Sequence, residues 1–300
     1  MVFSVLPDNT TRVLSLQSGD IDIAHYVAPE SVATLNTSSN LAVATAPPVA
    51  LAYMYINHRR GPWQDLRVRQ AIAQAVDREA LVRAVMQGQA IAATGPFPPS
   101  VLDCGSRVKG QPFNPGQARQ LLAQAGYQDS SGDGYLDKDG QTLVMTLVTY
   151  RQRPELVPIA ETIQASLKNI CIKVEVRMVE NINNALAQSD WDGGMYFNNM
   201  ATTGDPYWGL SQFFVTGGPA NRGGFSSAKV DALAQQVSQT SLRQTRQQLA
   251  CEASQAVVDE VATVPLLYPN FNYGVSRQVT GFGSPHPFFL YFLDSTLGKR

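Results

Sequence analysis

The chain has 300 residues, of which 44% are hydrophobic, and 23 basic and 24 acidic side chains give it a formal net charge of −1. Such a chain can bury a large core in one domain or two. The near-neutral balance argues against a nucleic-acid partner, because domains that bind nucleic acid carry a basic excess. No uninterrupted apolar run reaches about 18 residues, so the sequence predicts no membrane-spanning helix.

Residues 3–26 predict a short helix followed by a strand. A polar capping cluster at 9–11 precedes Val13, Leu14 and Leu16, which can face a core, and Gly19 is suited to end the helix. Acidic and apolar side chains then alternate, as in a strand with one solvent-facing side. Nothing nearby would raise the pKa of these acids, so we do not interpret them as a catalytic pair.

Residues 43–86 predict two extended segments, a loop at 61–62 and two helices. The first segment contains two prolines, which suits a crossover strand. The first helix has apolar residues at helical spacing between 66 and 76. Asp77 is the expected N-cap of the second helix, and Gly88 is expected to close it.

Residues 114–178 predict a βαβ unit preceded by one further helix. Asn114 as a cap and Gly126 as the closing glycine bound that helix. The stretch 129–140 is interpreted as a hairpin turn, because a calcium loop requires a glutamate where Gly140 stands. Strands at 142–150 and 172–178 enclose a helix beginning at 156, so the two strands should be parallel neighbours.

The chain has three cysteines and three histidines, which are Cys104, Cys171, Cys251, His25, His58 and His286. No C-x-x-C spacing and no histidine pair at ligand spacing occurs, so we expect neither a protein-bound metal nor a cofactor. The cysteines are interpreted as small buried residues with at most one disulfide, whose partners stay open. No G-x-S-x-G, H-E-x-x-H or phosphate-binding motif is found, so we do not expect an enzyme.

The stretch most suited to contact a ligand is 190–231, which includes a predicted strand at 194–198 and leads into predicted helices at 226–239 and 242–259. It combines aromatic side chains, paired glycines and one arginine, as do loops that line clefts at the carboxyl ends of strands. Phe213 and Phe214 are expected in the core. The candidate ligand-binding residues are Tyr196, Thr202, Tyr207, Trp208, Asn221 and Arg222.

Several segments together resemble the extracellular solute-binding proteins of peptide and nickel ABC importers. The resemblance covers about 5–294, and its motifs include a strand ending in Tyr-Ile-Asn at 55–57, D-x-R-V-R-Q-A at 65–71, A-V-D-R-E-A-L-V at 75–82, T-G-D-P-Y-W-G-L-S-Q-F-F at 203–214 and N-R-G-G-F-S-S-A-K-V-D-A-L at 221–233. It implies an α/β fold, a lobe like that of type II periplasmic binding proteins with a mixed, largely parallel sheet flanked by helices.

The resemblance also implies a domain organisation. Residues 1–48 are expected to be part of a first lobe, 49–269 the ligand-binding lobe, and 270–300 a return strand and tail to the first lobe. Relatives have an upstream portion with a signal peptide, which we expect to be absent from this chain. The implied location is periplasmic or extracellular through a lipid anchor, and the expected partners are a small-molecule ligand and an ABC permease, with no nucleic acid and no second copy.

The implied function is to capture nickel or another metal as a small-molecule chelate and to deliver it to the membrane permease. The alternative is a di- or oligopeptide-binding protein, and a sensor or chaperone built on the same lobe also stays open. Peptide-binding relatives hold the peptide amino terminus with an aspartate where this chain has Thr202, which cannot pair with an ammonium. Asn221 and Arg222 are expected to recognise the carboxylates of a chelator, because the loop 215–222 has no histidine for the metal.

Overall fold

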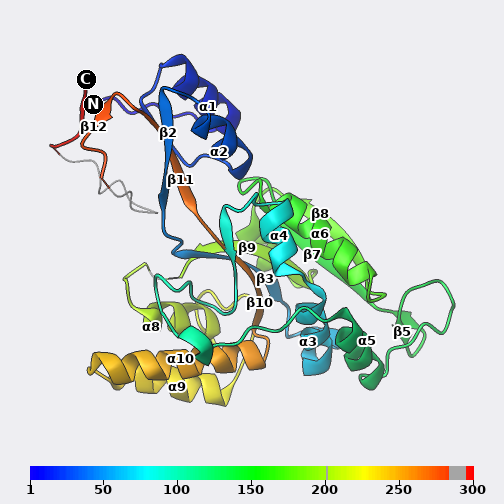
Figure 1. The fold of residues 1–300 in the computed structure, drawn as a ribbon. Coiled ribbons are helices and arrows are strands. Elements are labelled where there is room, and N and C mark those ends of the chain that lie inside the picture. The colour runs from blue at the N-terminus through cyan, green and yellow to red at the C-terminus, as the bar shows by residue number, and fades with distance from the viewer. Residues whose placement is uncertain (201, 284–294) are drawn as a thin grey trace. The chain divides into compact units, whose positions relative to one another are not determined.

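The computed structural model describes residues 1–200, 202–283 and 295–300 (Figure 1). The chain divides into two compact units. Unit 1 comprises Met1–Pro48, Met86–Ile91 and Pro269–Arg300, and unit 2 comprises Val49–Val85 and Ala92–Tyr268. Their assignment to the lobes of a larger protein stays a prediction, and His286 lies outside the described residues.

Unit 1 is a small antiparallel sheet with two helices. Its strand order is β1-β11-β2, and Gly274 of β11 lies so close to helix α1 that an added Cβ would be 2.5 Å from Leu16. Gly19 ends α1 with a φ of 84°, as predicted, whereas the cap is Asp8, just ahead of the predicted cluster. The elements are α1 (Asn9–Ser18), β1 (Ile23–His25), α2 (Pro29–Asn36), β2 (Leu41–Ala46), β11 (Phe271–Ser276), and the short pair β12 (Val279–Thr280) and β13 (Gly298–Lys299).

One prediction in unit 1 was wrong. Leu14 is 58% exposed, whereas Val13 and Leu16 are buried in the unit's apolar cluster. Three residues spaced this closely cannot all lie on one face of a helix, because successive residues are about 100° apart.

The main sheet has the strand order β4-β10-β3-β9-β7-β8. Strand β7 is parallel to β8 and to β9, whereas β3 is antiparallel to both β9 and β10. Four strands therefore run in one direction and β3 runs against them, which confirms the predicted mixed, largely parallel sheet. The strands are β3 (Ala50–Ile56), β4 (Ala90–Ala92), β7 (Val144–Tyr150), β8 (Lys173–Val179), β9 (Gly193–Asn199) and β10 (Thr263–Pro269).

The predicted βαβ unit is confirmed in β7, α6 (Leu156–Lys168) and β8, whose strands pair in register from Val144 with Lys173 to Tyr150 with Val179. The later strands β9 and β10 share a direction but are not neighbours. Strand β3, from much earlier in the chain, bonds to both and lies between them.

The helices of unit 2 begin largely where the capping signals place them. Asp65, Asp77 and Asn114 each accept a hydrogen bond from a backbone N–H of the first turn of their helix. Helix α4 ends at Ala84, so the prediction that Gly88 closes it was wrong; Gly88 lies in the following turn, with a φ of 79°. The helices are η1 (Gly61–Gln64), α3 (Leu66–Ala75), α4 (Arg78–Ala84), η2 (Gly105–Arg107), α5 (Pro115–Gln124), α7 (Ile182–Leu186), α8 (Pro206–Gly209), the π-helix η3 (Leu210–Phe214), α9 (Ala228–Gln239) and α10 (Arg243–Asp259).

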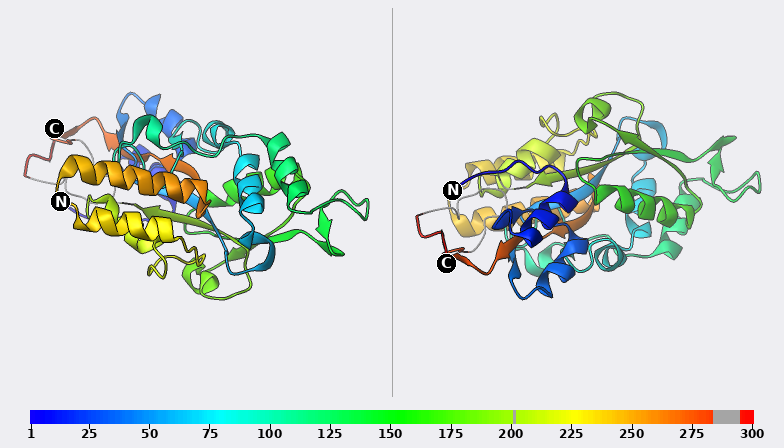
Figure 2. Two further views of the ribbon diagram at one scale, coloured as in Figure 1. Left: turned by 90° about the horizontal axis from the view of Figure 1, so that it is seen from below. Right: turned by 90° about the horizontal axis from the view of Figure 1, so that it is seen from above.

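Helices α9 and α10 pack side by side, and α3 packs against α5 (Figures 1 and 2). Phe213 and Phe214 are buried, as predicted. The stretch 129–140, predicted as one hairpin turn, contains a loop closed by the bridge between Gln128 and Asp137 and the turn of a second, two-stranded hairpin, β5 (Asp137–Lys138) with β6 (Gln141–Thr142).

A disulfide between Cys104 and Cys251 joins the start of η2 to helix α10, and Cys171 has a free thiol. The structure thus selects one bridge among the pairings that the sequence left open. Among the described residues, no helix is both long and apolar enough to cross a membrane.

Candidate functional site

The side chains of the motif segment 55–82, which carries much of the resemblance, make contacts that stabilise the fold of unit 2. Buried Arg69 donates to the carbonyl groups of Trp63 at 3.0 Å, Gln64 at 2.7 Å and Glu260 at 2.9 Å. Exposed Arg67 pairs with Asp65, the residue that caps α3. Arginine carries five donors in a fixed plane, so it can join several carbonyl groups at once.

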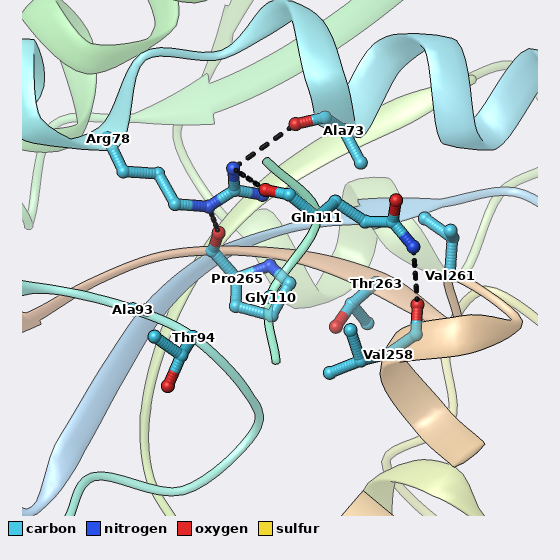
Figure 3. Close-up of a pocket in the computed structure, with 10 residues that line it drawn as sticks. All are labelled: Ala73, Arg78, Ala93, Thr94, Gly110, Gln111, Val258, Val261, Thr263 and Pro265. Carbon is cyan, nitrogen blue, oxygen red and sulfur yellow. Dashed lines mark hydrogen bonds between the residues drawn. The ribbon is translucent and has the colours of Figure 1, made fainter. Parts of the chain in front are cut away.

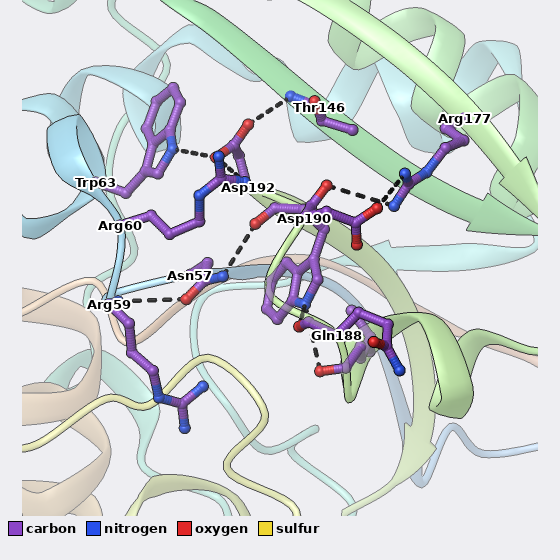
Figure 4. A network of polar contacts seen from close by, with 11 residues as sticks. Asn57, Arg59, Arg60, Trp63, Thr146, Arg177, Gln188, Asp190 and Asp192 are labelled. Carbon is purple, nitrogen blue, oxygen red and sulfur yellow. Dashed lines mark hydrogen bonds and ion pairs between the residues drawn. The ribbon is translucent and has the colours of Figure 1, made fainter.

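Asp192, just before β9, connects three elements of unit 2 (Figure 4). Its Oδ1 accepts from the indole N–H of Trp63 at 2.8 Å and lies 3.2 Å from Nη1 of Arg60. Its Oδ2 accepts from the backbone N–H of Thr146 on β7 at 2.8 Å. Asp192 is 6% exposed, and every one of these contacts is structural.

Arg78 lines a small hollow of about 10 Å³ beside β10 (Figure 3). Its Nε donates to the carbonyl of Pro265 at 2.7 Å, and its Nη1 lies 3.2 Å from the carbonyl oxygens of Ala73 and Gln111. Burial lowers the pKa of Arg78 to about 10, which leaves it charged at neutral pH. The hollow holds about one water molecule, too little for a ligand.

The candidate ligand wall is the segment 202–225, which follows β9 and contains α8 and η3. Its Gly-Asp-Pro turn is fixed by Asp205, whose Oδ1 caps Tyr207 and whose Oδ2 accepts from Nη2 of Arg246 at 2.8 Å and Nε at 3.1 Å. Thr202 is exposed in the same turn. The Asp205 carboxylate is therefore paired with Arg246 of α10.

Tyr207 and Trp208 lie on α8 and are half-buried. The Tyr207 ring lies 5.9 Å from the Arg246 guanidinium, and the Trp208 ring packs edge-on against Phe213 at 5.7 Å. In the described part of the chain, the indole N–H of Trp208 has no hydrogen-bond partner.

Asn221 is used within its own loop. Its side-chain NH₂ donates to the carbonyl groups of Val215 at 3.0 Å and Phe225 at 2.7 Å, and its Oδ1 accepts from the N–H of Phe225. It is 8% exposed. A ligand contact by Asn221 would require breaking these bonds, so its geometry fits a brace for the loop rather than a ligand contact.

Arg222, in contrast, is held through its backbone, and its guanidinium is unpaired within the described part of the chain. Its carbonyl accepts from Nη1 of Arg59 at 2.9 Å. In the described residues, the guanidinium has no hydrogen-bond or ion-pair partner. Burial raises the pKa of the Tyr55 phenol, and the positive charge of Arg222 partly opposes this rise.

Four tyrosines from three strands form a cluster on one face of the sheet. Tyr196 of β9 lies 5.5 Å from Tyr55, 5.8 Å from Tyr53 and 6.4 Å from Tyr150, measured between ring centroids. The Tyr196 hydroxyl donates to Oδ1 of Asn183 at 2.9 Å. The structure thus places Tyr196 beside Tyr55, whose hydroxyl bonds to Ala220 in the loop that carries Arg222, while Tyr207 and Trp208 contact Arg246 and Phe213.

Sequence reasoning missed Tyr53, Tyr55 and Tyr150 as neighbours of the candidate residues. Alternation places Tyr53 and Tyr55 on one face of β3, which was a usable signal. Their contact with Tyr196 depends on β3 pairing with β9 and could not be read from spacing.

The two described histidines do not form a metal site. The ring of His25 packs against Tyr273 at 5.1 Å, and Nε2 of His58 lies 3.0 Å from the carbonyl oxygen of Ala262. Burial, together with the charge of Arg69, lowers the pKa of His58 to about 4. No group of three or more metal-ligating side chains occurs among the described residues.

Comparisons with known proteins agree on the fold and the family. The chain is 29% identical to the oligopeptide-binding protein AppA of Bacillus subtilis over 94% of its length and 53% of the relative, and 26% identical to heme-binding protein A of Haemophilus influenzae over 100% and 54%. It spans about half the length of these curated relatives.

Solved structures give the same result. Bacillus subtilis AppA in complex with a nonapeptide superposes with a TM-score of 0.82 at 28% identity, covering 94% of this chain and 57% of that one. Staphylococcus aureus NikA in complex with Ni(L-His)₂ gives 0.81 at 25% identity, covering 98% and 61%. The family model of bacterial extracellular solute-binding proteins, family 5, middle part, matches residues 1–221. The chain therefore belongs to the bacterial extracellular solute-binding proteins of family 5.

Proposed function

We propose that this chain is the ligand-binding portion of an ABC importer's solute-binding protein, and that it captures nickel or another metal as a small-molecule chelate. The observation that carries the proposal is Arg222, whose backbone carbonyl is held by Arg59 and whose guanidinium has no partner in the described residues. A planar guanidinium binds carboxylates in a bidentate manner. The ligand is thus an anion, and its carboxylate meets Arg222.

Aromatic side chains support a compact ligand. Tyr196 lies in the same cluster as Tyr55, which bonds to the loop of Arg222, and Tyr207 and Trp208 present further rings on α8. Aromatic rings provide large rigid contact area at a small entropic cost. Because the described residues contain no metal-ligating cluster, the chelator itself supplies most ligands of the metal. The solved NikA relative was crystallised with such a complex, Ni(L-His)₂.

The alternative ligand is a short peptide, as in the AppA complex with a nonapeptide. Arg222 could then hold the peptide carboxylate. A peptide also brings an ammonium, which needs a negative partner when it is desolvated. Thr202 has no charge, and the carboxylate of Asp205 is engaged with Arg246, so we rank the peptide second.

We further propose that the full-length protein is a monomer located outside the cytoplasmic membrane, periplasmic or lipid-anchored, and that it delivers its ligand to a membrane permease without acting as an enzyme. The family is one of extracellular solute-binding proteins, which supports this location. Binding proteins work by complementarity and closure around a ligand and need no activated nucleophile.

The test is isothermal titration of the full-length protein with Ni(II)–L-histidine and with a mixed pool of di- and tripeptides. We expect saturable heat with the chelate and none with the peptides. Arg222→Ala should weaken binding at least about tenfold, or about 1.4 kcal/mol. Its thermal midpoint should change little, since the guanidinium has no described partner to lose.

Arg83→Ala is the matched control, because Arg83 is an exposed arginine of α4 in the same unit. It removes the same charge and should leave affinity unchanged. A large loss of stability with intact affinity in Arg222→Ala would make Arg222 structural. Saturable heat with the peptide pool alone would put the peptide function first.

A further inference from the structure

The loop that carries Arg222 is attached to β3 and to the residues that follow it. The hydroxyl of Tyr55 donates to the carbonyl of Ala220 at 2.7 Å. The backbone N–H of His58 donates to the carbonyl of Gly223 at 2.9 Å, and the Arg59 side chain donates to the carbonyl of Arg222 at 2.9 Å. The carbonyl groups of three loop residues, 220, 222 and 223, are thus held by the end of β3 and by the two residues 58 and 59 beyond it.

The attachment requires a glycine. A Cβ added to Gly223 would lie 2.3 Å from the carbonyl oxygen of Ile56, well inside contact distance. The loop therefore lies directly on the backbone of β3. Any residue larger than glycine at 223 would lift the loop away.

The Tyr55 hydroxyl has a fixed direction. Its single proton is donated to the carbonyl of Ala220, and its oxygen accepts a hydrogen bond from the Tyr53 hydroxyl at 2.9 Å. Both tyrosines are at most 2% exposed, so both hydroxyls are largely shielded from solvent. Only the Tyr55 hydroxyl reaches the loop, at Ala220, two residues before Arg222.

We propose that Tyr55 is a positioning residue for Arg222: its hydrogen bond to Ala220 holds the loop so that the guanidinium is preorganised for the carboxylate of an anionic ligand. The proposal rests on the proposed function. Preorganisation improves affinity because the ordering of the loop is completed before binding. Tyr55 itself need not touch the ligand.

Tyr55→Phe removes only the hydroxyl, and Tyr53→Phe is the matched control, because the Tyr53 hydroxyl reaches Tyr55 but not the loop. In the full-length protein, Tyr55→Phe should weaken binding of Ni(II)–L-histidine about threefold to tenfold, the effect of one hydrogen bond. Tyr53→Phe should change it less than about twofold. In an Arg222→Ala background, Tyr55→Phe should have no further effect on affinity, because Tyr55 acts through Arg222.

A second readout is independent of the ligand. Hydrogen exchange of the peptide covering 219–225, measured by mass spectrometry, should speed up in Tyr55→Phe and not in Tyr53→Phe, with exchange of α6 unchanged in both. Equal exchange in Tyr55→Phe and the parent protein overturns the proposal. So does an equal affinity loss with and without Arg222. If the chelate does not bind at all, the proposed function fails while the exchange data still decide whether Tyr55 holds the loop.

Gly223→Ala provides a variant that leaves both hydroxyls in place. It should reproduce the fast exchange and the weaker binding, because the added methyl displaces the loop from β3. Normal exchange in Gly223→Ala would contradict the close approach and with it the proposal.

Discussion

Replacing Asp192 by alanine tests whether the contacts at the start of β9 stabilise unit 2. The substitution removes the acceptors of the Trp63 indole N–H and the Thr146 backbone N–H. Trp63 is 1% exposed, so its donor would be left without a partner. Each unsatisfied donor costs about 1 to 3 kcal/mol, so the two together cost about 2 to 6 kcal/mol.

The ion pair with Arg60 adds little to that figure. The Arg60 side chain is 43% exposed, and pairs of this kind contribute about 0 to 1 kcal/mol. Arg60→Ala is therefore the control and should lower the free energy of unfolding by less than about 1 kcal/mol. Trp63→Phe should cost much less in the Asp192→Ala background than alone, since its donor has already lost its acceptor.

The assay is urea unfolding at neutral pH, followed by circular dichroism and by tryptophan fluorescence, with the slope of each transition checked for equality between variants. A loss below about 1 kcal/mol in Asp192→Ala would refute the reasoning, because it would mean that water satisfies both donors. An equally large loss in Arg60→Ala would assign the stabilisation to the ion pair instead.

Two further predictions concern stability. Burial holds the pKa of His58 at about 4 in the folded chain, against an ordinary value of 6.5. The unfolded chain therefore binds a proton first as the pH falls, and stability should decrease between pH 6.5 and 4, by at most about 3 kcal/mol. His58→Gln should flatten that part of a pH series of urea unfolding, and an unchanged slope would assign the pH dependence to other groups. Replacing Cys104 and Cys251 together by serine removes a disulfide that closes a loop of 147 residues. The free energy of unfolding should fall by about 2 to 5 kcal/mol relative to the oxidised parent. An unchanged urea midpoint would show that packing alone holds η2 on α10.

Local features of the fold could be predicted because the residues that encode them are neighbours in the chain. Asp77 and Asn114 cap helices whose first N–H groups lie three residues away. The apolar stretch 142–150 and the alternation in 172–178 indicated strands β7 and β8, and the helix between them required a parallel pairing. The predictions for Leu14 and Gly88 were wrong because they required more precision than the pattern has. A shift of one residue moves Leu14 to another face of its helix, and a shift of a few residues moves the end of α4 away from Gly88.

The candidate site was predicted only in part. The aromatic and glycine content of 190–231 identified the segment, and Arg222 stood out as its single arginine. The spacing of residues in this segment could not show that the side-chain amide of Asn221 donates its hydrogen bonds to the carbonyl groups of Val215 and Phe225. An asparagine available to a ligand and one that braces a loop have the same sequence signal.

The family, the mixed α/β class and the order of most elements could be predicted from the amino-acid sequence, since capping, periodicity and motifs depend on residues that are close in the chain. Which distant segments meet became visible only in the folded chain. Strand β3 lies between β9 and β10, Cys104 finds Cys251, and Tyr55 bonds to Ala220 across 165 positions. These contacts depend on which buried surfaces pack together and on which donors remain unsatisfied, and both are properties of the folded chain as a whole.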